Sequence, residues 1–202
     1  MSSIKDKLID WVTEMENYRM PNWNDLPDID LYMDQVTQLF EGAYAAGKRN
    51  QEDKILTKTM INNYAKDNLL FPIKNKRYTK EHIMFIQFIY QLKASLSIRD
   101  TKTVLEKLNQ SVKEESIDID QIYDQYVLLM EKQVDDFVQS LTRMLEEVDE
   151  IVAEMDDHDQ VYLKQLFLIF SLVHQSNMYR RLAERLTDRL VEDSKTDNKQ
   201  KD

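Results

Sequence analysis

The chain has 202 residues, including 2 glycines, 3 prolines and no cysteine, and its formal charge is −10. The missing cysteines exclude disulfides, thiolate metal sites and a cysteine nucleophile, while few turn residues among many helix formers predict an all-α protein. The charge is uneven, because residues 57–113 carry 11 basic and 4 acidic residues. Such a segment is typical of a nucleic-acid contact, of a solvated face, or of an internal contact with acidic residues 114–194.

The first third of the chain predicts two helices separated by a broken segment. Apolar residues at helical spacing indicate a helix over residues 4–15, and prolines and turn residues interrupt the pattern over 19–30. We expect Asp28 or Asp30 to cap a second helix that contains Leu31 and ends near Gly47. No apolar run has the length of a membrane span, and the N-terminal residues lack an uncharged apolar segment, so a cytoplasmic protein is expected.

The basic segment predicts three shorter helices with recognisable starts. Thr57 is expected to cap a helix that runs to about Asn68, with Met60, Ile61 and Tyr64 facing inward. Pro72 prevents that helix from continuing. Two further helix starts are indicated by a Ser or Thr with a partner three residues later, Thr79 with His82 and Ser97 with Asp100.

The C-terminal part predicts a long helical hairpin over residues 118–193. Its first helix has an unbroken heptad pattern of apolar residues: Tyr123, Val127, Met130, Val134, Phe137, Leu141, Met144, Val148, Ile151 and Met155. In the second helix the expected inward residues are Leu166, Phe170, Val173, Tyr179, Leu182, Leu186 and Leu190. So wide an apolar surface is expected to pack on the front domain, on a second chain, or on both. Residues 195–202 are expected to form a disordered tail.

The segment 57–82, which includes MINNYAKDNLLFPIKNKRY, resembles the winged helix-turn-helix of MerR-type transcription regulators. That family commonly reads T-I-R-Y-Y-E-R-x-G-L-L-x-P in its recognition helix and Y-R-x-Y in its wing. This chain has Asn62-Asn63 in place of the Arg-Tyr pair and Asn75-Lys76 in place of the wing Tyr-Arg. Residues 8–110, which include NWNDLP, MINNY, LLFP and KRYTKEHI, are also similar to the YkrK-like family of largely uncharacterised Gram-positive bacterial proteins.

These resemblances imply a MerR-like DNA-binding domain over residues 1–113 and a dimerisation or effector module over 114–194. The recognition helix would span residues 57–68 and the wing residues 72–78. Lysine and arginine neutralise phosphates, and asparagine can pair with adenine. The expected DNA contacts are Lys58, Thr59, Asn62, Asn63, Lys66, Lys74, Lys76, Arg77 and Tyr78.

Each of these contacts has a plainer alternative. Asn62 and Asn63 are equally well explained as exposed polar residues, and packing is the stronger interpretation of Tyr64 and Tyr78.

The three histidines lack metal-ligand spacing, and DDHD at 156–159 is better explained as a turn between helices. No phosphate-binding glycine loop or nucleophile motif is present, so no catalytic residue, metal or cofactor is expected.

The sequence therefore predicts a DNA-binding transcription regulator that acts on double-stranded DNA as a homodimer through residues 118–193. A small effector of unspecified chemistry is compatible with this function. The alternative is a non-catalytic module that has lost DNA binding and holds a protein partner or a small effector, because the acidic hairpin would repel duplex.

Overall fold

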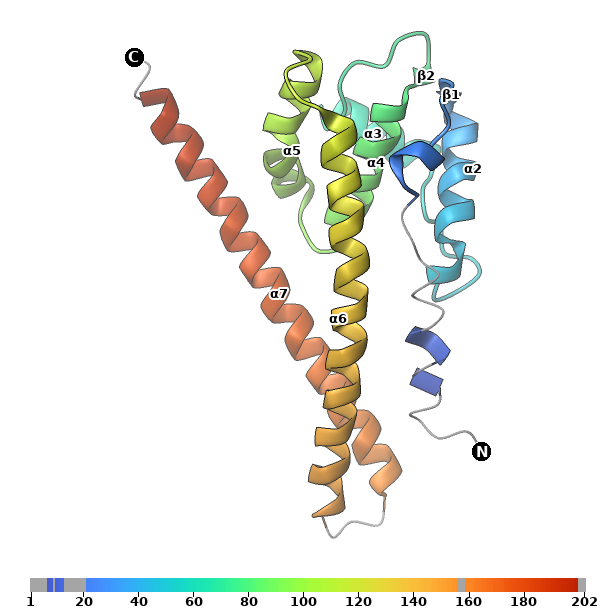
Figure 1. Cartoon of the computed structure of the whole chain (residues 1–202), viewed down its shortest axis with the longest axis vertical. Helices are drawn as coiled ribbons and strands as arrows, with labels where there is room; N and C mark the ends of the chain where they lie inside the picture. Colours follow the sequence, from blue (N-terminus) through green and yellow to red (C-terminus); the bar gives the residue numbers. More distant parts are fainter. Residues whose placement is uncertain (1–6, 9, 13–20, 156–158, 200–202) are drawn as a thin grey trace.

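The computed structural model describes residues 7–8, 10–12, 21–155 and 159–199, without the side chains of 194–199. The described chain is mostly helical, as expected, and Figure 1 shows two long C-terminal helices beside a bundle of shorter ones. Its elements are η1 (Trp23–Asp25), β1 (Leu31–Tyr32), α2 (Met33–Tyr44), η2 (Ala45–Gly47), α3 (Lys58–Lys66), β2 (Arg77–Tyr78), α4 (Lys80–Lys93), α5 (Ile98–Lys113), α6 (Ile119–Ala153) and α7 (Gln160–Lys199). Within these ranges, no helix combines the length and the apolarity needed to cross a membrane.

Three predicted helix starts are confirmed by their capping hydrogen bonds. The Thr57 hydroxyl accepts the Met60 N–H of α3 at 3.2 Å, and the Ser97 hydroxyl accepts the Asp100 N–H of α5 at 3.1 Å. At the start of α4 the bond runs the other way, from the Thr79 N–H to His82 Nδ1 at 3.2 Å. Each cap satisfies an N–H that has no partner inside its helix, which is why such positions can be recognised from sequence.

The predicted start of α2 is wrong. Neither Asp28 nor Asp30 caps this helix, because Leu31 and Tyr32 are extended and pair with Tyr78 and Arg77 in an antiparallel two-stranded sheet. The helix begins at Met33, and the Tyr32 N–H donates to Gln35 Oε1 at 2.9 Å. A strand of two residues leaves no alternating pattern in the sequence, so apolar periodicity alone places Leu31 in the helix.

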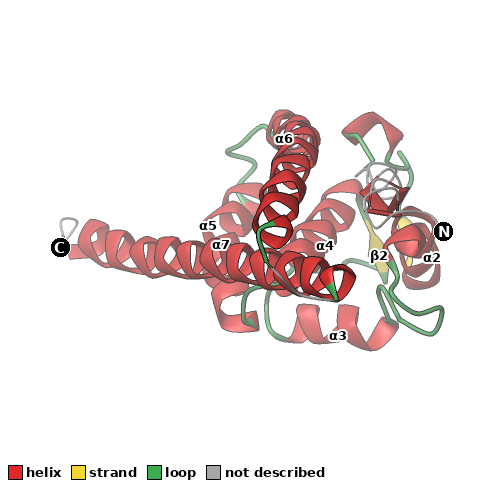
Figure 2. Cartoon of the chain, turned by 90° about the horizontal axis from the view of Figure 1, so that it is seen from below, coloured by secondary structure: helices red, strands yellow, loops and turns green. Residues whose placement is uncertain are grey.

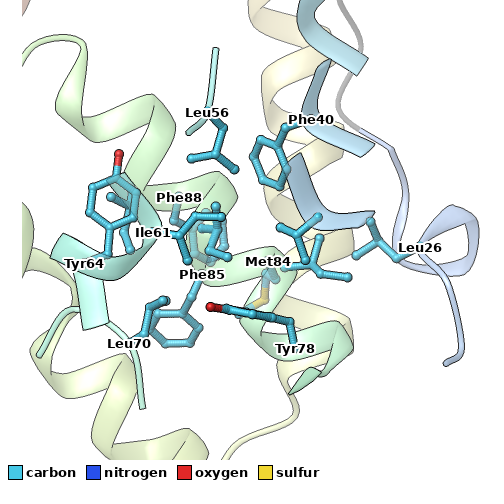
Figure 3. Packing of buried hydrophobic residues seen from close by; sticks show 14 of the residues in the cluster. Leu26, Phe40, Leu56, Ile61, Tyr64, Leu70, Tyr78, Met84, Phe85 and Phe88 are labelled. Atoms are coloured by element: carbon cyan, nitrogen blue, oxygen red, sulfur yellow. The ribbon is translucent and has the colours of Figure 1, made fainter. Parts of the chain in front are cut away.

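The shorter helices enclose one hydrophobic core, shown in Figure 3. The buried side chains come from η1, α2, α3, α4, α5, β1, β2, the segments on either side of α3 and the first turns of α6. The largest of those that are completely buried are Tyr44, Tyr123, Phe85, Ile61, Leu69, Ile83, Met84, Ile86 and Ile89. Helix α6 therefore contributes to the front core with one end and to the hairpin with the other.

A second core joins the two long helices. Leu141, Met144, Leu145, Val148 and Val152 of α6 pack with Leu168 of α7, and Val12 from the N-terminal segment joins them. The heptad pattern of α6 therefore meets two different partners, with Tyr123 and Val127 in the front core. Of the expected seam residues, Phe137, Ile151 and Met155 are exposed.

Helix α7 differs most from expectation. Of the residues predicted to face inward, Phe170, Val173, Tyr179, Leu182, Leu186 and Leu190 are all at least 49% exposed. The reason is visible in Figure 1: α7 lies against α6 near their connection and then diverges from it. Its helix continues to Lys199, into the segment expected to be a tail, and residues 200–202 lie outside the described residues.

Candidate nucleic-acid interface

Helix α3 presents a polar face to solvent. Thr59, Asn62, Asn63 and Lys66 follow one another at spacings of three, one and three residues, so they lie on one side of the helix, and all four are exposed. On the opposite side Ile61 and Tyr64 are buried in the front core (Figure 3). The apolar side therefore fixes which residues the helix offers to a partner.

The C-terminal end of α3 is also fixed, by a residue in the left-handed conformation. Asn68 has φ 58°, and the Leu69 N–H reaches back to the Tyr64 carbonyl at 2.9 Å while the Asn68 N–H bonds to Ala65 at 3.2 Å. This pair of bonds is a Schellman motif, in which asparagine is the most common substitute for glycine. The motif redirects the chain from the helix toward the basic turn.

The basic segment after Pro72 forms a tight turn over residues 74–77. The Arg77 N–H donates to the Lys74 carbonyl at 2.9 Å, and Asn75 and Lys76 have φ of 52° and 58°. Positive φ at both central residues is the signature of a type I′ turn, in which asparagine followed by glycine is preferred. Lys76 occupies the position that favours glycine, and the side chains of Lys74, Lys76 and Arg77 are exposed.

Comparing Lys76→Gly with Lys74→Gly separates the effect of backbone conformation from the effect of losing a lysine charge. A non-glycine residue in the left-handed region is strained by about 1–2 kcal/mol, partly offset by the greater chain entropy that glycine loses on folding. We expect Lys76→Gly to raise the free energy of unfolding by up to about 1 kcal/mol, measured by urea denaturation. Lys74→Gly is the matched control and should lower it, because the φ of Lys74 is not positive.

Arg77 is held in place by an aromatic neighbour from β1. Its guanidinium carbon lies 5.1 Å from the centroid of the Tyr32 ring, and its Nη2 donates to the Tyr32 hydroxyl at 3.2 Å. Tyr32 is 52% exposed. The sequence contains no signal for this contact, because 45 residues separate Tyr32 from Arg77 and only the strand pairing brings them together.

Two of the expected contact residues have other partners. Tyr78 is only 3% exposed and lies in the front core, so its packing role is supported and its expected phosphate contact is corrected. Burial also raises the pKa of its hydroxyl. Lys58 is exposed and forms an ion pair with Asp34 of α2. Tyr78 is therefore not free to contact a polyanion, whereas exposed Lys58 stays among the expected contacts with the outer face of α3 and the turn.

His82 connects the turn to the core. Its ring lies 3.8 Å from that of Phe71, centroid to centroid, and is 2% exposed. Burial lowers the pKa of His82, opposed by the carbonyl of Phe71 and the negative charge of Glu81. The folded protein therefore holds the neutral imidazole, which accepts the Thr79 N–H.

This burial predicts a loss of stability in mild acid. Because the pKa of His82 is lower in the folded state than its usual 6.5, the unfolded chain binds the proton first. The contribution of His82 to the free energy of unfolding is fully present above about pH 6.5. It is lost as the pH falls below that value and through the folded pKa. The free energy of unfolding of His82→Gln, which keeps an acceptor at the capping position, should depend less on pH between 7.5 and 5. His174→Gln changes an exposed histidine and should leave the wild-type pH dependence; equal slopes in all three proteins would contradict the prediction.

Family comparison places this site in a defined domain. Residues 21–126, more than half of the chain, match the model of a domain of unknown function, DUF1836. The protein belongs to the DUF1836 family. No curated protein and no solved structure matches the chain. The DUF1836 segment contains α3, the basic turn and nearly all of the front core, in which Val127 of α6 is the buried residue just beyond it.

Among the residues that the structure describes, no group of three or more His, Cys, Asp or Glu is placed to hold a metal ion. DDHD at 156–159 has only its last residue in the described part. One shallow hollow lies between α2 and the start of α3 and has a polar lining of mixed charge that includes Glu41, Lys48 and Asp53.

Proposed function

We propose that this protein is a DNA-binding transcription regulator that binds duplex through α3 and the turn at residues 74–77. The observation that carries the proposal is the outer face of α3: two amides, a hydroxyl and a lysine on one exposed side of a helix that Ile61 and Tyr64 anchor from behind. Asparagine amides pair with adenine in the major groove. Lysine and arginine bind phosphates without reading sequence.

The order of the elements supports a winged helix-turn-helix of MerR type. A short strand, two helices, a basic turn, a second short strand and two further helices precede a long helix, and the two strands pair. One feature is unusual, because residues 45–57 separate α2 from α3 where a helix-turn-helix commonly has a turn of 3–4 residues. The shared core, which includes Phe40 of α2 and Ile61 of α3, holds these helices in place of a tight turn.

In this function a homodimer through residues 118–193 would place two α3 helices on one duplex, as two-fold symmetric regulators do. The outer face of α3 would enter the major groove, and Lys74, Lys76 and Arg77 would lie along the phosphates. No catalytic residue, metal or cofactor enters this function.

The test is selection of bound fragments from genomic DNA, followed by competition with single-base variants of the selected site. Asn62→Ala should abolish discrimination at one base pair, a loss of about 1–3 kcal/mol, and should keep the affinity for random duplex. The exposed Gln110 of α5 provides the control, because Gln110→Ala should change neither quantity. Absence of any retardation of duplex at low salt would overturn the proposal and favour a protein-interaction module. The exposed apolar residues of α7 would support that alternative.

A further inference from the structure

Helix α7 carries an apolar surface that the described residues leave open. Near its C-terminal end, five large apolar side chains lie on one side of the helix and are 49–73% exposed. This C-terminal stripe consists of Met178, Tyr179, Leu182, Leu186 and Leu190. A second open set, near the start of α7, includes Tyr162, Ile169, Phe170 and Val173. The two sets face different directions, because helical rotation separates them by well over a quarter turn.

The C-terminal stripe continues the seam that α6 covers. Leu168 and Leu172 pack with α6, and a heptad step from Leu172 leads to Tyr179 and then to Leu186. Helix α7 diverges from α6 before it reaches these residues (Figure 1). On its other side α7 lies beside α5, in the half where Thr187 is buried (Figure 2). The stripe therefore has the pattern of a helix-packing face, and no helix among the described residues covers it.

We propose that the C-terminal stripe of a second copy of this chain covers it, in an antiparallel α7–α7 contact. This inference rests on the homodimer of the proposed function and assigns it to a defined part of the hairpin. At about 200 Å² for a fully exposed large apolar side chain, the five residues offer about 600 Å² per chain. Two copies would bury about 1,200 Å², above the roughly 1,000 Å² expected of a specific interface.

The stripe is self-complementary, as a two-fold contact requires. An antiparallel pair with its axis at residue 184 places Leu182 opposite Leu186 of the second copy and Met178 opposite its Leu190. Antiparallel helices also oppose their dipoles favourably. A heterologous partner would have no reason to match this symmetric spacing.

Sedimentation equilibrium of the full chain tests the contact with two matched double variants. Leu182→Glu/Leu186→Glu places charges in the stripe, and we expect the dimer to dissociate roughly 100-fold more readily. Ile169→Glu/Val173→Glu adds the same charges to the other open set and should leave the dimer intact. All four residues are exposed, so both variants should keep the wild-type helical circular dichroism.

Three outcomes would overturn the inference: a wild-type monomer at tens of micromolar protein, a dimer that survives the first variant, or a dimer that only the second variant dissociates. Retardation of random duplex, measured on the same proteins, separates this question from DNA binding. A Leu182→Glu/Leu186→Glu monomer that still retards duplex would leave the proposed function standing, whereas a dimer without retardation would remove that function and leave the interface.

Cysteine cross-linking tests the direction of the helices, because the native chain has no cysteine. In the antiparallel pair, Leu182→Cys/Leu186→Cys places the thiol at position 182 of one copy opposite the thiol at position 186 of the second. Mild oxidation should then give a covalent dimer. Leu182→Cys alone should cross-link poorly, since its own symmetry mate lies about four residues, or about 6 Å, away along the helix. Efficient cross-linking by the single variant would indicate a parallel pair and contradict the proposed arrangement.

Discussion

Replacing Lys74, Lys76 and Arg77 together with glutamine is expected to weaken duplex binding about 100-fold near 0.1 M salt and to lower the salt slope by about 3. Each phosphate that a protein neutralises releases condensed counterions, so log affinity falls with log salt by about 0.9 per contact. The three side chains are exposed and lie within one four-residue turn, which allows all of them to follow the same phosphate strand. The measurement is a titration of random duplex at several salt concentrations.

A matched triple on another element decides whether position or net charge matters. Arg99, Lys102 and Lys107 are exposed residues of α5 inside the same basic segment. Arg99→Gln/Lys102→Gln/Lys107→Gln changes the net charge by the same amount and should leave the slope nearly unchanged. If both triples reduced it equally, the protein would bind DNA by general attraction and the turn would have no special role.

The local parts of the fold could be predicted because their causes are local. A hydroxyl at Thr57 or Ser97 caps a helix through a neighbour three residues away, so the sequence itself contains both partners. The polar face of α3 follows from the apolar positions of Ile61 and Tyr64 in the same way. These features determine which side chains the candidate interface exposes.

Contacts between distant residues could not be predicted from the same patterns. Apolar periodicity indicates that one side of a helix avoids water, and it says nothing about which element covers that side. Leu182 and Leu186 fit a buried stripe as well as Leu168 does, yet the divergence of α7 from α6 leaves them exposed. The stacking of Arg77 on Tyr32 similarly depends on the pairing of two strands of two residues.

The individual roles of the site residues were harder to separate. Tyr78 stands next to three exposed basic positions, but strand pairing turns its side chain into the core. Asn62 and Asn63 are adjacent and both exposed, so the structure assigns them to the same face without choosing between them. Base discrimination by Asn62→Ala, compared with that of Asn63→Ala, distinguishes the residue that reads the base from its neighbour.

Tyr123→Ala is expected to lower the free energy of unfolding by about 3–5 kcal/mol, the range typical of a buried aromatic residue truncated to alanine. Tyr123 is fully buried in α6, and its ring packs edge-on against Trp23 at 5.9 Å between centroids. Its hydroxyl lies 2.7 Å from both Gln87 Oε1 and the Pro21 carbonyl. One side chain therefore fixes α6 to α4 and to the segment that precedes η1.

Two further variants separate the contribution of the buried ring from that of the hydroxyl. Tyr123→Phe keeps the ring and removes the donor, so it should lower the free energy of unfolding by about 1–2 kcal/mol, because buried acceptors lose their partner. Tyr162→Ala makes the same truncation at a side chain that is 56% exposed, and should stay within about 0.5 kcal/mol of wild type. Urea denaturation followed by circular dichroism and by tryptophan fluorescence measures all three.

The two signals also test how α6 joins the parts of the molecule. Trp23 is buried in the front core and Trp11 is 53% exposed, so the fluorescence change on unfolding comes mainly from Trp23, whereas α6 and α7 dominate the helical signal. Because α6 is a single helix that enters both cores, loss of Tyr123 should destabilise both and the two transitions should stay coincident. A fluorescence transition that moved alone would mean that α6 transmits no rigidity from the front core to the hairpin. The direction in which a dimer presents its two α3 helices would then be free to vary.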